Sequence, residues 1–590
     1  MSYQDILKKF QSKAEFEVVL KADDSYEYAR SISNSRFHHR PGAVSFCRFP
    51  QDVAECLIFC KQHKVPFRVR SGGHHHEGMS SGNGLMVIDL SRLYRDPETN
   101  ECKISYEEDN GQYAWIPPGM KLQRVYEELR SIGAVIPGGG CQSVNVGGLT
   151  QGGGWGVHIR KYGLTCDQLV DVEIVLADGT AIVASELNKN KHGKDGQELL
   201  WALRGGGGGN FGVVTRFKFR LCSLNPTMTS FGIFWKKKVD IINMITRWAE
   251  LHEEDSTLPK ELSCTTNMFR VGEEKSEEGI RGRLGGNFYG TKAELIKLLK
   301  KEFGSLIPLD GDEPITKDGK GVDSFFSSIN EQKIKVLEGE EEKKNTAAES
   351  TQDHLQSGYR VLTRESREYI YEQLNVISGI SGDAGAGGHI KAVEPDKATF
   401  KYDVLPSAPN TTCDMPHPHK VTSLYPKKGI DHRKLANQVY DQLKGHPFLA
   451  DVNRYMVWHC LGGAMRNPEF EKLSSFAYRD KPYMLQLQAW WNHAGQLRND
   501  QSRDHDYTQW VNDFRQELDS KGWTEGAFIN FVDRDIPVKA SGDEGRMELL
   551  KHYFGKNMER LRAAKTQFDP DNLFDFGMGL LPVKSKGSKN

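Results

Sequence analysis

Three glycine-rich segments of the sequence could hold a ligand that carries phosphate groups. They cover residues 71–78, 138–156 and 205–212, and each contains consecutive glycines. Consecutive glycines permit positive φ angles and let bare backbone N–H groups approach a ligand closely. Such groups suit the oxygens of a pyrophosphate. One segment alone would be interpreted as a turn or a loop, but three in one part of the chain favour a large phosphate-bearing cofactor.

Two of these segments also carry reactive side chains. Residues 74–76 form a run of three histidines, and Cys141 directly follows three glycines, which argues against a plain buried thiol. Adjacent histidines in an extended loop point in different directions and do not suit one metal ion. A second set of possible zinc ligands lies in a proline-rich loop, where a single thiol favours a surface interpretation: Cys413, His417 and His419. We therefore expect no metal site.

The motif spacing excludes two common phosphate sites. A Rossmann fold needs GxGxxG after its first strand, and these segments lack that spacing. No GxxxxGK[ST] motif occurs either, so P-loop chemistry is not expected. The ten cysteines include no CxxC pair, which argues against zinc-ribbon and thioredoxin sites. Cys56 and Cys60 are at helical spacing and are expected to be buried thiols.

Length and composition describe a globular chain with more than one domain. Its 590 residues exceed what one hydrophobic core usually serves. Charged residues make up 27%, and the formal net charge is -1, so neither nucleic acid nor an anionic membrane is an expected partner. No apolar run approaches the length needed to cross a bilayer. The N-terminus lacks the apolar core of a signal peptide, which favours a cytoplasmic location, although a secreted chain without its leader would look the same.

The elements that must position the glycine-rich segments are short strands and helices. Strand-type runs cover residues 66–69, 85–90, 170–176 and 213–221. Helical spacing covers residues 53–62 and 122–132, and a helix is also expected over 547–568. Between about 226 and 545 the pattern changes to charged amphipathic helices and aromatic-bearing strands, with loops expected at 308–350 and 404–428. This mixture predicts an α+β chain.

Several long strings resemble one known family. RVRSGGHHHEG at 68–78 and GGGCQSVNVGGLTQGGGWG at 138–156 resemble the two flavin-attachment loops of berberine bridge enzyme-like proteins, within the vanillyl-alcohol oxidase superfamily. LLWALRGGGGGNFGVVTRFKF at 199–219 continues the pattern of their FAD domain. Near the end, YFGKNMERLRAAKTQFDPDNLF at 553–574 resembles their C-terminal segment.

This resemblance implies a fold and a cofactor. The expected fold is a two-domain PCMH-type FAD-binding fold plus a substrate domain, whose antiparallel sheet is backed by helices. We expect residues 1–225 to form the FAD domain, with 547–590 returning to it, and residues 226–546 to form the substrate domain. FAD is expected to be bicovalently attached, through the ring of His74 to the flavin 8α carbon and through the sulfur of Cys141 to C6. Further cofactor-binding residues are expected at Arg70, Ser71, Gly72, Gly73, His75, Gly78, Val144, Gly147, Gly148, Gly153, Gly154, Gly156, Gly212, Val213 and Asn530.

The chain departs from the family at the position of its usual catalytic base. The family motif NYxD supplies a tyrosine, but here Phe531 stands in the segment NFVD. Leu149 replaces a histidine that often supports the flavin, and His76 replaces a tyrosine. Alignment with two strands of the family, together with alternation along each strand, directs His459, Gln486 and Gln488 inward. There His459 could accept a proton, while the glutamines could only hold a hydroxyl. His76 is the competing base, followed by Tyr483.

The resemblance also implies a reaction. We expect hydride abstraction from a C–H bond next to a hydroxyl or amine of a bulky substrate, either an oligosaccharide or a phenolic, alkaloid or polyketide. Val144 occupies the family's oxygen-gate position, where valine favours an oxidase that reduces O2 to H2O2. The alternatives are a non-redox cyclase that keeps FAD as a scaffold, a dehydrogenase with another electron acceptor, and a catalytically idle binding protein. A monomer or a homodimer is expected.

Overall fold

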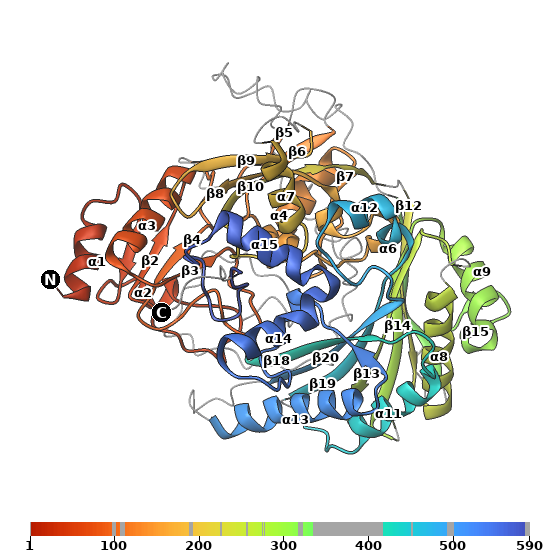
Figure 1. The fold of residues 1–590 in the computed structure, drawn as a ribbon. Helices are drawn as coiled ribbons and strands as arrows, with labels where there is room; N and C mark the ends of the chain where they lie inside the picture. Colours follow the sequence, from red (N-terminus) through yellow and green to blue (C-terminus); the bar gives the residue numbers. More distant parts are fainter. Residues whose placement is uncertain are drawn as a thin grey trace.

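A computed structural model describes residues 2–96, 102–106, 112–187, 193–224, 227–254, 258–273, 275–276, 278–316, 323–333, 417–449, 452–491 and 501–583. The described chain combines helices with parallel and antiparallel strands, and most strands belong to three sheets (Figure 1). The expected α+β class is thereby confirmed.

The first sheet presents the first glycine-rich segment at the end of a strand. Its order is β1 (Val18–Leu20), β2 (Ala43–Phe46), β4 (Met86–Asp89) and β3 (Phe67–Arg70), and β2, β4 and β3 run parallel. Helix α3 (Pro50–His63) provides the crossover that parallel strands require. Its residues Cys56 and Cys60 are buried free thiols in the same core as Met86, as their helical spacing indicated.

A second, antiparallel sheet supports the other two glycine-rich segments. Its order is β5 (Ser105–Tyr106), β6 (Tyr113–Ile116), β10 (Val213–Arg220), β8 (Leu169–Val175) and β9 (Ala181–Ser185). Helices α4 (Leu122–Ser131) and α7 (Gly193–Leu203) contribute Leu122, Leu129 and Leu199 to the core beside it. The segment at 138–156 includes the short helix α5 (Val146–Gln151), and the segment at 205–212 joins α7 to β10.

The third sheet has eight strands and is antiparallel throughout. Its order is β17 (Ser324–Lys333), β12 (Thr227–Trp235), β14 (Ile280–Phe288), β13 (Leu262–Arg270), β19 (Val452–Cys460), β20 (Tyr483–Trp491), β18 (His419–Pro426) and β21 (Thr524–Glu525). Three helices cover one face: α8 (Lys238–Glu254), α11 (His432–Lys444) and α13 (Gln501–Ser520) (Figure 1). This is the expected antiparallel sheet backed by helices.

Alternation along the strands separates the two faces of this sheet. Leu284, Trp458 and Leu485 point to the helices and join their core. Phe234, Phe269 and other aromatic side chains lie on the opposite face, which faces the glycine-rich segments. The helix-covered face therefore anchors the sheet, and the other face remains available to line a site.

The C-terminal segment packs against the core of the second sheet. The single helix expected over 547–568 is in fact two, α14 (Gly542–Phe554) and α15 (Met558–Phe568), because Gly555 adopts a positive φ of 44° between them. Leu550 and Leu561 lie in the same core as Leu199. The structure thus returns the chain end to the early sequence, whereas the domain boundaries near 225 and 547 stay predictions.

Two expected loops contain strands. Within 404–428, residues 404–416 lie outside the described part, but His419–Pro426 form β18. The two prolines are compatible with this strand because Pro418 precedes it and Pro426 stands at its last position. Neither proline therefore removes an N–H donor from the middle of the strand pairing. Within 308–350, Ser324–Lys333 form β17, and residues 334–350 lie outside the described part. This strand is polar because it is an edge strand, paired along β12 alone.

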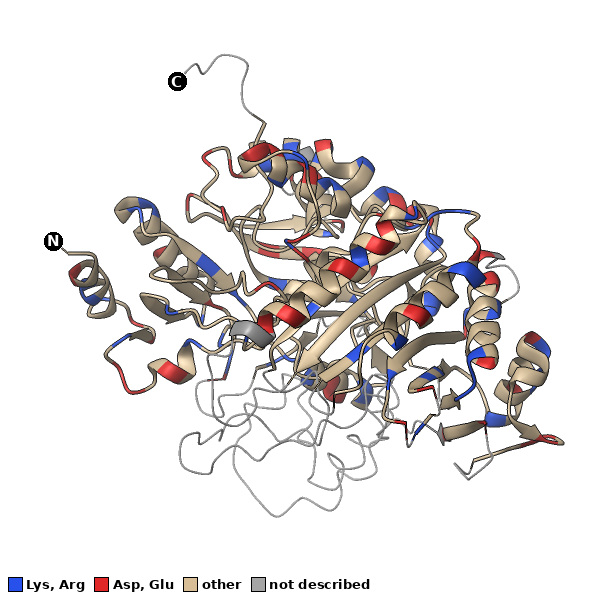
Figure 2. Ribbon diagram, turned by 90° about the horizontal axis from the view of Figure 1, so that it is seen from below, with Lys and Arg blue, Asp and Glu red and all other residues tan. Residues whose placement is uncertain are grey.

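The described surface mixes charges of both signs. Figure 2 shows acidic and basic residues interleaved along the outer helices, in keeping with the formal net charge of -1. Among the helices that the structure describes, none combines the length and apolar character needed to cross a membrane.

Candidate active site

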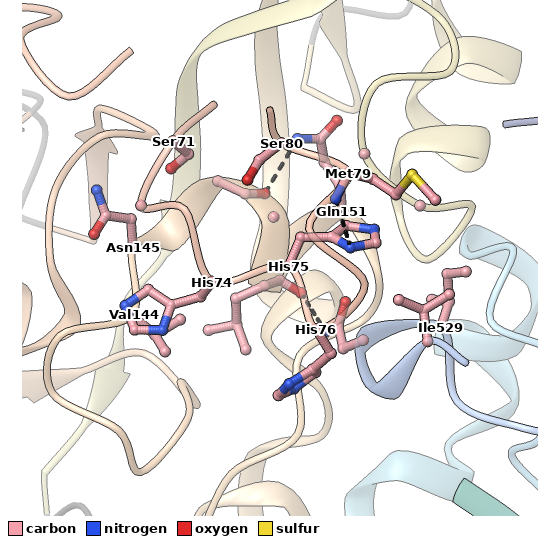
Figure 3. A pocket seen from close by; sticks show the side chains of 18 of the residues that line it. Ser71, His74, His75, His76, Met79, Ser80, Val144, Asn145, Gln151 and Ile529 are labelled. Carbon is pink, nitrogen blue, oxygen red and sulfur yellow. Dashed lines mark hydrogen bonds between the residues drawn. The ribbon is translucent and has the colours of Figure 1, made fainter. Parts of the chain in front are cut away.

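A cavity of about 470 Å3 lies between the glycine-rich segments and the open face of the eight-stranded sheet. Figure 3 shows the histidine run crossing this cavity, with Ile529 approaching from the C-terminal segment. Most of the expected site residues line it: Ser71, Gly72, Gly73, His74, His75, His76, Cys141, Val144, Gly147, Gly148, Gly212, His459, Gln486, Gln488 and Asn530. Residues from four distant parts of the sequence thus meet at one site.

The glycine-rich segments leave room for a cofactor that contacts the protein backbone along a long stretch. A Cβ atom added at Gly148 would meet no atom within 4 Å, so the space beyond this glycine belongs to the cavity. The hydroxyl of Ser71 and the backbone N–H of Gly147 both donate to the carbonyl of Pro118, at 2.5 and 3.0 Å, and this shared acceptor joins the first two segments. The buried hydroxyl of Ser80 lines the cavity and has no hydrogen-bond partner among the described residues. These features fit a dinucleotide such as FAD.

Six of the expected cofactor-binding residues lie behind the cavity wall. Arg70 is buried in an ion pair with Asp89 at 2.5 Å and donates to the carbonyl of Ala29 at 2.6 Å. The others pack against protein: Gly78, Gly153, Gly154, Gly156 and Val213. A Cβ at Gly156 would stand 1.7 Å from the carbonyl oxygen of Gly138, so only glycine fits there. These residues therefore support the shape of the loops from behind.

Tyr483 points away from the cavity. It lies on the helix-covered face of β20, where its hydroxyl hydrogen-bonds to Nδ1 of His432 at 2.8 Å and its ring contacts Trp248. Burial raises the pKa of the Tyr483 hydroxyl well above its usual value. Tyr483 therefore cannot reach a substrate in the cavity.

His459 sits in the cavity wall with one nitrogen bonded and the other open. Its Nε2 lies 2.6 Å from Oε1 of Gln486, which can only accept, so Nε2 carries the proton. Nδ1 then keeps a lone pair, and this buried atom has no hydrogen-bond partner among the described residues. Trp155 packs against the ring at 4.2 Å between centroids. Burial lowers the pKa of His459 to about 4, although the bond to Gln486 opposes that shift. The imidazole is therefore neutral at pH 7 and can accept a proton.

Gln488 is oriented by two neighbours. Its Oε1 accepts from the hydroxyl of Tyr455 at 3.0 Å and from Nε1 of Trp490 at 2.8 Å. Both donors are fixed on the same sheet face, so the amide is held in one orientation. Because Oε1 faces these donors, the amide nitrogen is the end that can donate to a substrate oxygen.

His76 forms a pair with a histidine that the sequence did not indicate as catalytic. Nδ1 of His76 lies 2.9 Å from Nε2 of His419, and Nδ1 of His419 lies 2.9 Å from the carbonyl oxygen of His417. A carbonyl only accepts, so in the neutral pair His419 carries its proton on Nδ1, accepts through Nε2, and leaves Nε2 of His76 without a proton. Burial lowers the pKa of His76 to about 3, assisted by His75, His74 and Lys420.

His419 was missed as a site residue because its strand was interpreted as part of a loop. The only signal for it is alternation along residues 419–425, which places every second side chain on the cavity face. Its ring stacks on Trp490 at 4.0 Å between centroids. Of the three residues considered as possible zinc ligands and interpreted as surface residues, Cys413 lies outside the described part, and the backbone carbonyl of His417 meets Nδ1 of His419.

Phe531 stands between the two candidate bases. Its ring centroid lies 5.9 Å from that of His459 and 5.9 Å from that of His76, and it also contacts Phe528 edge-on at 5.2 Å. The family's tyrosine position is thus filled by an apolar ring that faces both imidazoles.

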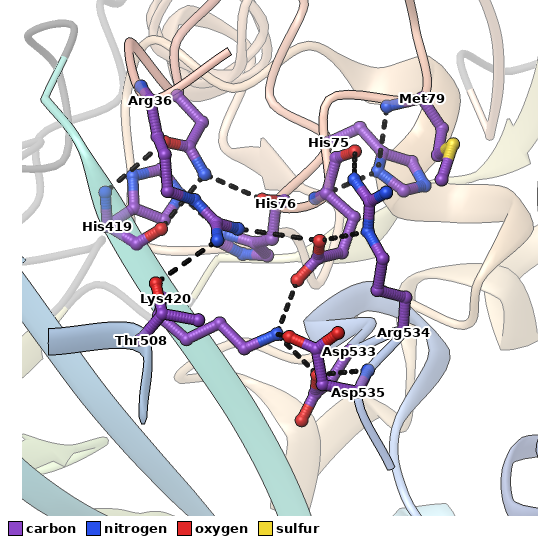
Figure 4. Close-up of polar contacts among 12 residues, drawn as sticks. Arg36, His75, His76, Met79, His419, Lys420, Thr508, Asp533, Arg534 and Asp535 are labelled. Carbon is purple, nitrogen blue, oxygen red and sulfur yellow. Dashed lines mark hydrogen bonds and ion pairs between the residues drawn. The ribbon is translucent and has the colours of Figure 1, made fainter. Parts of the chain in front are cut away.

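A buried ion cluster fastens the histidine run to the large sheet and to the C-terminal segment. The ammonium of Lys420, on β18, lies 2.8, 2.5 and 2.8 Å from carboxylate oxygens of Glu77, Asp533 and Asp535 respectively. Figure 4 shows Lys420 beside Asp533 and Asp535. The three acidic groups could hold a metal ion by their spacing, but the ammonium already fills the space between them. Burial raises the pKa of Asp533, yet the attraction of Lys420 and Arg515 outweighs it and holds this pKa below its usual value.

Comparisons with known proteins agree with this site. The family model described as an FAD binding domain matches residues 41–185, and the one described as berberine and berberine-like matches residues 527–580. The fold, the cavity and the glycine-rich segments that line it together define an FAD-linked oxidoreductase. In the matched segments the chain is similar to berberine bridge enzyme-like proteins.

Relatives cover nearly the whole chain at low identity. An uncharacterized FAD-linked oxidoreductase of Bacillus subtilis, YgaK, is 26% identical over 96% of this chain and 97% of its own length. A tetrahydroberberine oxidase of Berberis wilsoniae is 25% identical over 90% of this chain and 84% of its own. Among solved structures, an isoleucine-to-valine variant of the grass pollen allergen Phl p 4, described as a glucose oxidase, is similar in fold. It has a TM-score of 0.70 and 19% identity, and the match covers 99% of this chain and 100% of that chain. The wild-type allergen is described as a glucose dehydrogenase.

The ion cluster leads to a stability prediction. We expect Lys420→Met to lower the free energy of unfolding by about 3–5 kcal/mol, because it leaves buried carboxylates without their counter-ion. Lys427→Met, at an exposed position just after the same strand, should change it by less than about 0.5 kcal/mol. Chemical denaturation at pH 7 measures both. Since the pKa of Asp533 is lowered in the folded state, its contribution is present at neutral pH and is lost as the pH falls through that pKa. Equal stabilities of the two variants would contradict this role.

Proposed function

We propose that this protein is an FAD-dependent oxidase that removes a hydride from a C–H bond next to a hydroxyl or amine of a bulky substrate. The observation that carries the proposal is the neutral imidazole of His459, in the wall of the cavity that His74 and Cys141 also line, with an Nδ1 that has no hydrogen-bond partner among the described residues. Hydride loss from an alcohol gives a carbonyl only if a group also takes the hydroxyl proton. Supporting relatives include a protein named as an oxidase. Oligosaccharides and phenolic, alkaloid or polyketide compounds are the substrate classes proposed.

We propose bicovalent attachment of FAD through His74 and Cys141. Both residues line the same cavity, one from each of the two loops that Ser71 joins. The bound flavin supplies the redox chemistry, taking up a hydride and delivering two electrons to O2 to give H2O2. With the cofactor tethered, the walls do not have to enclose it, and a large substrate can enter from the sheet side.

The remaining residues bind and orient the substrate. The amide nitrogen of Gln488 can donate to the substrate oxygen, and Nδ1 of His459 can accept the hydroxyl proton. Gln486 holds Nε2–H of His459 and so keeps Nδ1 as the accepting atom. Phe531 and Trp155 cover the imidazole with apolar surface and exclude water from it. A proton acceptor thereby exists without the family's tyrosine.

A non-redox cyclase is the second candidate, and Phe531 favours it because the usual base is absent. An anaerobic screen of sugars, phenols and alkaloids separates the two proposals. Bleaching of the flavin absorbance by any substrate supports oxidation, whereas product formation with a permanently oxidised flavin supports cyclisation.

The attachment predicts the behaviour of flavin on denaturation. In wild-type protein, acid precipitation should leave the yellow flavin on the polypeptide because two covalent bonds hold it. His74→Ala and Cys141→Ala should each retain one link, and the double variant should release all of its flavin. Absorbance of the precipitate and supernatant, with peptide mass spectrometry, measures this. Free FAD from acid-treated wild-type protein would refute covalent attachment.

Val144 predicts how fast oxygen reoxidises the reduced enzyme. It lines the cavity, where the larger side chain of leucine would fill space that O2 must cross, since packed interiors leave no slack of a methylene's size. Val144→Leu should slow reoxidation at least about tenfold, which corresponds to roughly 1.4 kcal/mol of barrier. Val144→Ala is the matched control and should not slow it. The allergen pair supports such sensitivity, because an isoleucine-to-valine variant is described as an oxidase and the wild type as a dehydrogenase. Equal reoxidation rates in wild-type protein and in Val144→Leu would contradict the role of Val144 as an oxygen gate and would favour a dehydrogenase.

The base assignment predicts which histidine matters. His459→Ala should slow flavin reduction by substrate about 100-fold or more, the usual range for losing a general base. His419→Ala, which disturbs the pair of His76 and His419 instead, should slow flavin reduction far less. Since the proton acceptor must be neutral, the wild-type rate should be constant at neutral pH and fall as the pH drops through the pKa of His459, about 4. Stopped-flow reduction measures both. Normal reduction in His459→Ala together with slow reduction in His76→Ala would transfer the role to His76.

A further inference from the structure

Part of the wall of the large cavity is built by segments that do not belong to the eight-stranded sheet. Arg68 on β3 lines this part, with Gly208 and Gly209 of the third glycine-rich segment and Phe576 near the chain end. Nη1 of Arg68 donates to the carbonyl of Asp575 at 2.9 Å, and a Cβ added at Gly209 would stand 3.6 Å from the ring of Phe576. A cation, a glycine turn and an aromatic ring therefore meet in one part of the site.

The guanidinium of Arg68 contacts backbone carbonyls and pairs with no described carboxylate. Nη1 also donates to the carbonyl of Phe67 at 2.9 Å, whereas the buried Nε has no hydrogen-bond partner among the described residues. The nearest acidic group is that of Asp575, and its carboxylate already pairs with Arg546 at 2.9 Å. Burial lowers the pKa of Arg68, and Asp575 only partly opposes that shift. Because a partly buried charge is costly without a counter-charge, this position favours an anionic ligand.

The third glycine-rich segment adds backbone donors beside this cation. The N–H groups of Gly205 and Gly207 both donate to the carbonyl of Gln151 at 3.0 Å, but those of Gly208 and Gly209 donate to no residue in the described part of the chain. Gly207 and Gly209 have positive φ angles of 83° and 74°. Turns of this kind present successive N–H groups to an anion. Two backbone donors are thus available where Arg68 meets the cavity.

His75 contributes a further donor from the first glycine-rich segment. Its Nδ1 accepts from the backbone N–H groups of Glu77 at 3.2 Å and Met79 at 3.4 Å, so the proton of the neutral ring lies on Nε2. Burial lowers the pKa of His75 to about 4, and the charges of Arg534 and Arg68 assist. The ring is therefore neutral at pH 7, and it lines the cavity with an N–H that can donate to a ligand oxygen.

We propose that Arg68 binds the pyrophosphate of FAD, together with His75 and the N–H groups of Gly208 and Gly209. The planar fork of a guanidinium suits phosphate oxygens, and a charge-assisted hydrogen bond is stronger than a neutral one. The ring of Phe576 offers an apolar surface against which the adenosine half can pack. Arg68 thereby supplies the cofactor contact that was expected of Arg70. The proposal requires FAD, but it does not require the oxidase reaction proposed above.

Competition between FAD and its fragments tests the proposal without turnover. The full-length His74→Ala/Cys141→Ala variant is the parent protein, because it is expected to hold FAD without covalent bonds. Flavin fluorescence during titration gives the Kd of FAD and the concentrations of ADP and of adenosine that displace it. ADP should displace FAD at an at least about tenfold lower concentration than adenosine, since only ADP carries the pyrophosphate. Arg68→Gln should raise the Kd of FAD about tenfold or more and remove the advantage of ADP.

Arg546→Gln is the matched control, because Arg546 also holds Asp575 but does not line the cavity. It should keep both the Kd of FAD and the advantage of ADP. Arg68→Lys should keep part of that advantage, and it replaces Arg68→Gln if that variant does not fold. Equal competition by ADP and adenosine in the parent protein, or an advantage of ADP that survives in Arg68→Gln, would overturn the proposal. Equal weakening of FAD by Arg68→Gln and Arg546→Gln would do the same, since Arg68 would then only hold the chain end.

Flavin that stays covalently bound in the parent protein would contradict the attachment proposed above and leave the role of Arg68 to a second measurement. FAD must bind before any covalent bond can form, so the ratio of flavin to protein in singly substituted chains then decides. Arg68→Gln should incorporate less flavin than Arg546→Gln when both are produced at limiting flavin. Equal ratios in the two variants would overturn the proposal.

Discussion

The site depends on the burial of one ammonium group. Lys420 is fully buried on β18, and a charge in that position is tolerated only with well-placed partners. Those partners come from two distant segments: Glu77 directly follows the histidine run, and Asp533 lies two residues after Phe531. Pairing the ammonium of Lys420 therefore brings the first glycine-rich segment and the C-terminal segment against the same strand. The position of His76 relative to Phe531 follows from this requirement.

The register of the eight-stranded sheet fixes the positions of the side chains on the sheet side of the cavity. His459, Gln486 and Asn267 lie on the cavity side of the sheet because Trp458, Leu485 and Thr266 face the helices. A shift of one residue in pairing would exchange the two sets, burying polar groups against the helices and exposing the hydrophobic core. The free energy gained by burying the apolar side chains against the helices therefore fixes the positions of the polar side chains on the other face. The cavity-facing residues on β13, β14, β19 and β20 are therefore positioned together rather than singly.

Much of the cofactor side could be predicted from the sequence, because its signals are local. The glycine runs, the histidine run and Cys141 are contiguous strings whose chemistry can be interpreted without knowing the fold. The inward direction of His459 also followed from alternation within one strand. Arg70 shows the limit: its motif placed it with the cofactor loop, whereas the structure uses it to pair with Asp89 behind that loop.

The substrate side was harder to predict because its partners meet only through tertiary pairing. His419 was interpreted as a surface residue of a proline-rich loop, and only its pairing with β20 reveals a strand that carries it to His76. Tyr483 belongs to the same strand as Gln486 and Gln488, yet odd spacing places it on the other face.

The replacement of the family's tyrosine by Phe531 has a physical consequence for both imidazoles. A tyrosine hydroxyl in this position would need a hydrogen-bond partner, and it would solvate the neighbouring rings. The phenylalanine ring instead adds to the burial that lowers the pKa of His459 to about 4 and that of His76 to about 3. Both groups are therefore neutral at pH 7, with defined proton positions set by Gln486 and by His419. The substitution that removes the tyrosine usual in similar proteins thus leaves both neighbouring imidazoles in the unprotonated form that a proton acceptor requires.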